Sequence, residues 1–347
     1  MSNIENVDNN FKIETKINKA DIKFRDARTE PFKIHGVFYE GDRFRRMPEA
    51  VAKTVSEGVY ILHSNTAGGR LRFRTDSPYI AINVKMPTFG RMSHFALCGS
   101  SGFDLYVDGR HCMSFLPPFD TVDGYENILE LGTHQMRDIM IHMPLYSDVS
   151  EFYVGLCEDA KILEPAPYKI EKPIVFYGSS ITQGGCASRP GTAYQGFVSR
   201  DLDADFINLG FSGNARAEAE ISQYIASLDM SAFVYDYDHN APSIEHLERT
   251  HERMFLEIRS AQPTLPIIIM PRPKHVLNNE EEKRLAIIKK TYENAIARGD
   301  KNVYFISNSD LTAICGVEGT VDRTHPTDLG FFSMAAAVTN LLRKIFE

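Results

Sequence analysis

The order of apolar and polar residues divides the chain into two regions with different periodicities. Between Gly58 and about Glu158 the apolar residues come in short runs, such as Tyr79-Ile-Ala-Ile-Asn-Val-Lys85. These runs are rich in β-branched and aromatic residues and partly alternate with polar ones, which is typical of strands. Asp108-Gly109 between two of them is a tight-turn pair typical of a hairpin. The expected strands are 58–63, 71–75, 79–85, 103–107, 111–115, 128–131, 138–142 and 152–156. Many short strands without a long helix between them predict a β-sandwich of jelly-roll type.

After Pro173 the pattern changes, because short apolar runs now alternate with longer stretches of helical periodicity. Strands that alternate with helices predict a parallel sheet covered on both faces, and so an α/β fold. A segment with two prolines, Ile162–Tyr168, separates the regions. We therefore expect a β-sandwich over residues 1–165 and an α/β domain over residues 170–347. The expected strands of the second domain are 174–177, 206–209, 232–235, 266–270 and 303–306, and its clearest helices are 244–261, 280–298 and 329–346.

The first strand of the α/β region ends in a group of small residues, Gly178-Ser179-Ser180, and a glycine pair follows at 184–185. Ligands bind at the carboxyl ends of the strands in open α/β sheets. A strand that breaks into small residues there lifts a side chain out of the sheet, which makes Ser180 a candidate nucleophile. Gly-Ser-Ser is also common in ordinary loops, so the assignment needs partner residues elsewhere.

Those partners stand near the end of the chain, in Val321-Asp-Arg-Thr-His-Pro-Thr-Asp-Leu-Gly330. An Asp three residues before a His can fold back within one turn and accept a hydrogen bond from the His Nδ1–H. The His Nε2 is then free to take a proton from a serine hydroxyl. Asp322 and His325 are thus candidates for the orienting acid and the general base. The alternative is a capping Asp beside an exposed His.

Two loops at the ends of the next strands offer hydrogen-bond donors. Asn208–Asn214 contains Gly213, which can aim a backbone N–H into a site, and 236–242 contains the amide side chain of Asn240. Acyl transfer needs donors aimed at the oxyanion that develops during attack on the carbonyl. The N–H groups of Ser180 and Gly213 and the Asn240 amide would make three. The alternatives are a plain turn at Gly213 and a helix N-cap at Asn240.

Taken together, these segments resemble the four sequence blocks of the SGNH (GDSL-like) hydrolase superfamily. The blocks are Gly178–Gly184, Ser212-Gly213, Asn240 and Asp322–His325, in this order. Gly102-Phe-Asp-Leu-Tyr106 matches the Gly-x-Asp-Leu-Tyr signature of a β-rich domain that precedes the catalytic domain in some members. The resemblance implies an SGNH-type three-layer α/β/α domain after an N-terminal β-domain. It also implies Ser180 as nucleophile, Gly213 and Asn240 with Ser180 in the oxyanion hole, and Asp322 and His325 in the triad.

The chain departs from the family pattern at two places. The Asp of the usual Gly-Asp-Ser is Ser179, and the usual Gly-x-Asn-Asp reads Asp238-His239-Asn240-Ala241. The first change alters the hydrogen bonds that support the nucleophile loop. The second keeps the amide donor and places His239 beside it, where it can shape the pocket. Neither change removes a catalytic atom, so we expect an active enzyme.

Composition narrows the partners and the compartment. The formal net charge of −8, without a basic cluster, argues against nucleic acid, and no apolar run approaches the roughly 20 residues needed to cross a membrane. The first ten residues lack the basic and apolar regions of a secretory signal. Five scattered cysteines indicate reduced thiols, and we expect a cytoplasmic protein. The spacing of the histidines indicates no metal site, and we expect no cofactor.

We therefore expect a serine esterase that acts on small-molecule or oligosaccharide esters, with acetyl esters of carbohydrates favoured by the resemblance. The alternatives are an acyltransferase that uses the same triad and a non-catalytic carbohydrate-binding protein. The segment 87–101 is long for a hairpin connection and carries Arg91 and His94. These side chains suit a surface that meets a sugar or another subunit of a homo-oligomer. We expect this loop to line one side of the Ser180 pocket, or else to pack on its own sandwich.

Overall fold

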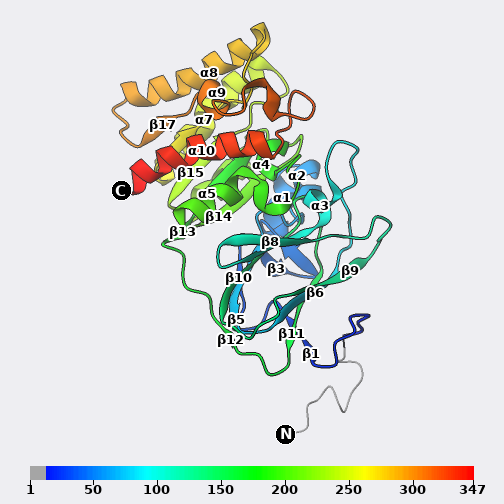
Figure 1. Ribbon diagram of the computed structural model, residues 1–347. Coiled ribbons are helices and arrows are strands. Elements are labelled where there is room, and N and C mark those ends of the chain that lie inside the picture. Colours follow the sequence, from blue (N-terminus) through cyan, green and yellow to red (C-terminus); the bar gives the residue numbers. More distant parts are fainter. Residues whose placement is uncertain (1–12) are drawn as a thin grey trace.

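The computed structural model describes residues 13–347, and Figure 1 shows a β-rich part at the bottom and an α/β part at the top. Two antiparallel sheets form the β-rich part, in the strand orders β1-β11-β6-β9 and β12-β5-β10-β7-β8, with β2 paired to β5. The strands are β1 (Ile22–Asp26), β2 (Lys33–His35), β5 (Arg70–Thr75), β6 (Tyr79–Lys85), β7 (Phe103–Val107), β8 (Arg110–Phe115), β9 (Gly124–Glu130), β10 (Arg137–His142), β11 (Glu151–Cys157) and β12 (Ile162–Leu163). A further pair, β3 (Phe38–Glu40) and β4 (Arg43–Arg45), stands apart.

A shared core holds the two large sheets face to face. Leu71, Phe73 and Ile141 enter it from one sheet, and Ile82 and Val154 enter it from the other, all fully buried. The alternation of apolar and polar residues along these strands places one face of each sheet in this core. The predicted sandwich is thus confirmed. The hairpin turn is where the sequence indicates it, with φ of 49° at Asp108 and 75° at Gly109.

One expected strand is wrong. Residues 58–63 form most of a helix, α2 (Glu57–Leu62), which follows α1 (Glu49–Val55). The Ser56 hydroxyl accepts a hydrogen bond from the Val59 N–H at 3.3 Å and caps α2. Val59 is buried while Ile61 is 61% exposed, which is a helical division of a run that looks uniformly apolar. Val59 lies in the core of the α/β part, although it precedes the expected domain boundary.

The α/β part is built on a five-stranded parallel sheet in the order β14-β13-β15-β16-β17. Helices α6, α7 and α8 pack on one face, and α5 and α10 pack on the other. The predicted three-layer α/β/α arrangement is therefore confirmed (Figure 1). The strands are β13 (Ile170–Gly178), β14 (Ala204–Gly210), β15 (Ala232–Asp236), β16 (Ile267–Ile269) and β17 (Val303–Phe305). The helices are α4 (Ser180–Gln183), α5 (Tyr194–Leu202), α6 (Ala219–Ser227), α7 (Ile244–Ala261), α8 (Asn279–Ala297), α9 (Asn308–Leu311) and α10 (Asp328–Phe346), and α3 (Leu97–Ser101) belongs to the sandwich loops.

The C-terminal helix α10 is long and apolar enough to cross a membrane by length and composition alone, with a mean hydropathy of 1.2. Its side chains Phe331, Met334, Val338 and Leu342 are buried in the core beneath the sheet. The apolar character of α10 is accounted for by this packing, as expected of a core helix.

The Gly-x-Asp-Leu-Tyr segment joins the two parts. The buried Asp104 carboxylate accepts hydrogen bonds from Arg189 Nη1 and from the Gly191 N–H, both at 2.9 Å. The Tyr106 hydroxyl accepts from the same Arg189 nitrogen at 2.7 Å. A side chain at Gly191 would place its Cβ 2.6 Å from the Tyr106 hydroxyl oxygen. The signature therefore marks a joint between sandwich and α/β part, which leaves little room for the two to move independently.

Candidate active site

The candidate nucleophile stands where β13, an inner strand of the parallel sheet, turns into α4. The Ser179 hydroxyl caps this short helix by accepting from the Ile181 N–H at 3.2 Å, and Ser180 is its first residue. The turn needs glycine at 178, because a Cβ there would lie 2.0 Å from an Asp236 carboxyl oxygen. Ser180 Oγ lies 2.9 Å from His325 Nε2, and Ser180 is 8% exposed.

His325 is oriented by the acid three residues before it. Its Nδ1 lies 2.7 Å from Asp322 Oδ2, while Asp322 Oδ1 accepts from the N–H groups of Thr324 and His325 at 3.0 and 2.8 Å. Arg323 adopts a left-handed φ of 70°, which closes the turn. Partial burial alone would raise the pKa of Asp322, but these hydrogen bonds outweigh it and lower that pKa to about 2. Asp322 thus carries a negative charge at neutral pH and can stabilise a protonated His325.

Donors for an oxyanion come from loops at the ends of the two neighbouring strands. The strand order β14-β13-β15 places the Gly213 loop on one side of Ser180 and the Asn240 loop on the other. The two loops touch, because Asn240 Oδ1 accepts from the Ala215 N–H at 3.2 Å. Gly213 has a left-handed φ of 71° and open space where a Cβ would stand. Among residues 13–347, no group accepts a hydrogen bond from the N–H of Ser180, the N–H of Gly213 or the side-chain Nδ2 of Asn240.

Two alternative roles that the sequence left open, those of Asn240 and Asp322 as helix caps, are not seen. Gly213 does lie in a turn, which a hydrogen bond from the Asn214 N–H to the Phe211 carbonyl oxygen closes at 2.9 Å. Helix α7 is capped by Ser243, whose hydroxyl accepts from the His246 N–H at 3.1 Å, so Asn240 is not its N-cap. The N-cap of α10 is Thr327, and Asp322 instead contacts His325. Ser180, His325 and Asp322 therefore form a continuous series of contacts, while Gly213 and Asn240 lie on loops that follow the two strands beside β13.

Of the three residues expected to contact substrate, His94 and His239 lie near His325, whereas Arg91 contacts another loop. The rings of His94 and His325 have centroids 5.4 Å apart, so the segment 87–101 reaches the site through His94. Arg91 instead donates to the carbonyl oxygens of Phe119 and Thr121 on another sandwich loop. Burial above all lowers the pKa of His239 to about 4, and the nearby charges of Arg272 and His325 lower it further. It is therefore neutral at pH 7.

Two residues of the site escaped the sequence analysis. Tyr146, from the loop after β10 of the sandwich, donates its hydroxyl hydrogen to the carbonyl oxygen of Ser180 at 3.1 Å. Asp236, the last residue of β15, accepts from the Thr182 hydroxyl at 2.9 Å directly beneath the nucleophile turn. Burial raises the pKa of Asp236 to about 8. A signal existed for Asp236, since a carboxyl group that ends an apolar strand run is unusual, whereas nothing in the sequence marks Tyr146.

One group of side chains within residues 13–347 has ligand atoms close enough to hold a metal ion. His94, Cys186 and His325 bring one ligand atom each within 4.8 Å of the others. The two ring nitrogens of His325 already contact Ser180 and Asp322. Burial, with the charge of Asp322, raises the pKa of the Cys186 thiol to about 12, which keeps it protonated. A metal ion here would have to displace the hydrogen bonds of His325 and deprotonate this thiol.

Both parts of the chain match known families. Residues 171–343 match the GDSL-like Lipase/Acylhydrolase family, and residues 22–162 match a family described as the N-terminus of Esterase_SGNH_hydro-type. A Bacteroides ovatus protein described as a GDSL-like lipase is 30% identical, with a TM-score of 0.84 over 94% of this chain and 98% of that one. No curated protein matches the chain.

Two more distant structures share the fold. A salicylyl-acyltransferase from a tetracycline biosynthetic pathway is 17% identical, with a TM-score of 0.77 over 94% of this chain and 98% of that one. A family two carbohydrate esterase from Clostridium thermocellum, in complex with cellohexaose, is 13% identical, with a TM-score of 0.61 over 91% and 99%. At identities this low the similarity shows a shared fold, which covers the sandwich as well as the α/β part.

Proposed function

This chain is an ester hydrolase of the GDSL-like lipase/acylhydrolase family, and from that premise we propose that it removes acetyl groups from carbohydrates through an acyl-serine intermediate. The observation that carries the mechanism is the unbroken chain of contacts from Ser180 Oγ to His325 Nε2 at 2.9 Å and from His325 Nδ1 to Asp322 at 2.7 Å. It is the arrangement that activates a serine hydroxyl.

In the first half of the reaction, Ser180 Oγ attacks the ester carbonyl and His325 Nε2 takes its proton. The ionised Asp322 stabilises the imidazolium that forms. The negative charge on the carbonyl oxygen is met by the donors of Ser180, Gly213 and Asn240. The intermediate collapses, the bond to the sugar oxygen breaks, and that oxygen receives the proton from His325. Water then attacks the acyl-serine and gives a proton to His325. The bond to Ser180 Oγ breaks, Ser180 takes that proton back from His325, and acetate leaves.

Two observations support a short acyl group on a carbohydrate. Ser180 is only 8% exposed, and His94 from the sandwich lies against its base His325, so a long acyl chain would have little room. The fold is also shared, over 91% of this chain, with a carbohydrate esterase whose structure was solved with cellohexaose.

Acyl transfer to another hydroxyl is the second candidate, because the salicylyl-acyltransferase shares the fold with a TM-score of 0.77. Hydrolysis is favoured by the open side of the triad, where the side chains of His325 and Asp322 are 23% and 37% exposed. Water can reach this side to attack the acyl-serine, whereas a transferase must keep water out.

The test is a panel of acetylated xylo-, manno- and cello-oligosaccharides, with 4-nitrophenyl acetate as a small control ester. We expect acetate release in water at a higher kcat/KM for at least one oligosaccharide than for the aryl ester. Acylated acceptor in place of free acetate would establish a transferase. Hydrolysis of the aryl ester alone would remove the carbohydrate from the proposal and keep the esterase.

A further inference from the structure

The loop that carries Gly213 is fixed at both ends by side-chain amides. At one end the Ser212 N–H donates to Gln183 Oε1 at 2.9 Å, and at the other the Ala215 N–H donates to Asn240 Oδ1 at 3.2 Å. Gln183 is fully buried at the end of α4, the helix that begins with Ser180. The direction of the Gly213 N–H therefore depends on where Gln183 holds the neighbouring residue.

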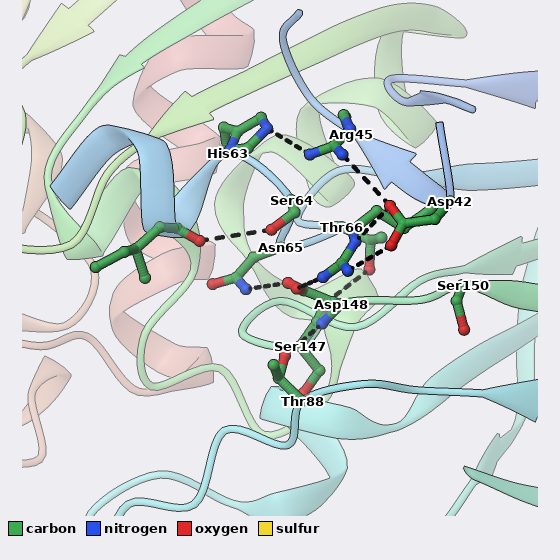
Figure 2. Close-up of polar contacts among 12 residues, drawn as sticks. Asp42, Arg45, His63, Ser64, Asn65, Thr66, Thr88, Ser147, Asp148 and Ser150 are labelled. Carbon is green, nitrogen blue, oxygen red and sulfur yellow. Dashed lines mark hydrogen bonds and ion pairs between the residues drawn. The ribbon is translucent and has the colours of Figure 1, made fainter. Parts of the chain in front are cut away.

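Gln183 is in turn held by the sandwich. Its Nε2 donates to Asn65 Oδ1 at 3.1 Å and to the Leu145 carbonyl oxygen at 3.2 Å. Asn65 Nδ2 donates to Asp148 Oδ1 at 2.8 Å, and Figure 2 shows this hydrogen bond. Arg43 Nη1 donates to the other carboxyl oxygen of Asp148 at 2.9 Å. We call Arg43, Asp148, Asn65 and Gln183 the Asp148 chain; it runs from the surface of the sandwich to the Gly213 loop.

Asp148 fixes which atoms of the side chains in this chain donate hydrogen bonds and which accept them. A carboxylate only accepts hydrogen bonds, so Asn65 must turn its NH₂ group toward Asp148 and its oxygen toward Gln183. Gln183 must then turn its NH₂ group toward Asn65 and its oxygen toward the Ser212 N–H. Reversal of either amide would set donor against donor in a buried place, which costs about 1–3 kcal/mol per unmet group.

We propose that the Asp148 chain positions the Gly213 N–H for the oxyanion, and thus that the sandwich is a working part of the active site. The inference rests on the proposed acyl-serine mechanism and deepens it. None of the four residues touches the reacting atoms, so they are positioning residues. A misplacement of about 1 Å far from the chemistry can cost on the order of 10² in rate, and loss of a whole oxyanion donor costs about 10²–10³ in kcat.

The decisive variant is Asp148→Asn, which keeps the shape but presents an NH₂ group to Asn65 or to Arg43, both of which are donors. We expect kcat for 4-nitrophenyl acetate to fall about 10- to 100-fold with KM within about twofold. The matched control is Thr88→Val. The Thr88 hydroxyl accepts from the backbone N–H of Asp148 at 3.0 Å and lies outside the chain, so its loss should leave kcat within about twofold.

A second readout does not depend on the natural substrate. The rate at which an alkyl fluorophosphonate phosphonylates Ser180 also requires donors at the oxyanion position, and we expect this rate to fall in step with kcat in Asp148→Asn. Combined with Gln183→Leu, Asp148→Asn should add almost nothing further, because both break the same chain. If Asp148→Asn does not fold, Asn65→Leu breaks the chain between Asp148 and Gln183, and we expect kcat to fall by a similar factor.

Three results would overturn the inference: equal activity of Asp148→Asn and Thr88→Val, an effect on KM alone, or independent effects of the Asp148 and Gln183 substitutions. A different result would contradict only the proposed substrate. If the wild-type protein reacts with the fluorophosphonate but releases no acetate from any carbohydrate, the substrate is wrong and the role of the Asp148 chain still stands. A wild-type protein that neither reacts with the fluorophosphonate nor hydrolyses any ester would contradict both the proposed function and the role of the Asp148 chain.

Discussion

The residues of the candidate site reach it in two different ways in the two parts of the molecule. In the α/β part, Ser180, Gly213 and Asn240 stand just beyond the ends of β13, β14 and β15, three neighbouring strands. In the sandwich, Tyr146 and Asp148 lie on one loop between β10 and β11, and His94 on another after β6. Parallel strands bring their carboxyl ends to one edge whatever the loops do, so their site residues are placed by the fold itself. Sandwich loops reach the site only because the two parts are docked together.

This difference implies that the α/β part supplies the reacting groups and that loops of the sandwich orient them. Buried polar contacts, beside apolar ones, dock the two parts and make such a division workable. Besides the Asp104 joint, the fully buried Arg70 guanidinium forms an ion pair with Asp205 and lies 3.7 Å from the centre of the Phe206 ring. A buried ion pair of this kind fixes orientation more than it adds stability, which is what the alignment of loops with strand ends requires.

The largest effect should come from the strand-end nucleophile. Ser180→Ala removes the attacking oxygen, and we expect turnover of 4-nitrophenyl acetate to fall by roughly 10⁶-fold, the order seen when a triad member is lost. The thermal unfolding midpoint should stay unchanged, because within residues 13–347 the hydroxyl forms a hydrogen bond with His325 alone.

A fluorophosphonate followed by peptide mass spectrometry should label Ser180 and no other residue. The matched control is Ser179→Ala, which removes the cap of α4 and leaves the nucleophile in place. Label at Ser179 in the wild type would show that the wrong hydroxyl has been assigned.

Next in size is the donor at the end of β15. Asn240→Ala should lower kcat about 10²–10³-fold, or about 2.7–4 kcal/mol, with little change in KM. The reason is that the amide meets a charge that is present mainly in the transition state. Steady-state kinetics on the aryl ester is the measurement, and a change in KM alone would reassign Asn240 to substrate positioning.

The sandwich loop should show a smaller and selective effect. Arg91→Ala combined with His94→Ala should impair hydrolysis of acetylated oligosaccharides about tenfold more than that of 4-nitrophenyl acetate, whose small leaving group need not touch the loop. Because His94 adjoins His325 while Arg91 binds the loop at Phe119 and Thr121, we expect His94→Ala alone to account for most of the loss. Equal losses on both esters would place His94 in the triad's support instead of in substrate recognition.

The same difference explains what could be predicted from the sequence. Three blocks that each follow an expected strand were enough to predict that Ser180, Gly213 and Asn240 belong to one site, because the carboxyl ends of parallel strands lie at one edge of a sheet. Asp322 and His325 lie three residues apart, so their contact is local. Tyr146 and the Asp148 chain depend on how two domains dock, and no periodicity records that. The error at 58–63 has a similar cause, since Val59 faces the core of the other part.

The smallest effect on activity should come from substitution of Asp236. This residue also stands at a strand end, but we do not expect it to take part in the reaction. Its carboxyl group is buried beneath the nucleophile turn, and burial raises its pKa from 3.8 to about 8. Between these values the folded protein holds a proton that the unfolded chain has released. The free energy of unfolding therefore falls as pH rises from about 4 to about 8, by up to about 1.4 kcal/mol per pH unit, and levels off above.

Asp236→Asn keeps the acceptor for the Thr182 hydroxyl and removes the titration, so kcat should stay within a few-fold of the wild type. Urea unfolding of both proteins at pH 5, 6, 7 and 8 measures the difference between them. The wild type should lose stability relative to the variant at each step, because only its buried carboxyl group is driven toward ionisation. Parallel pH profiles would show that Asp236 is ionised throughout, and a large loss of kcat in the variant would mean that this carboxyl group acts in the reaction after all.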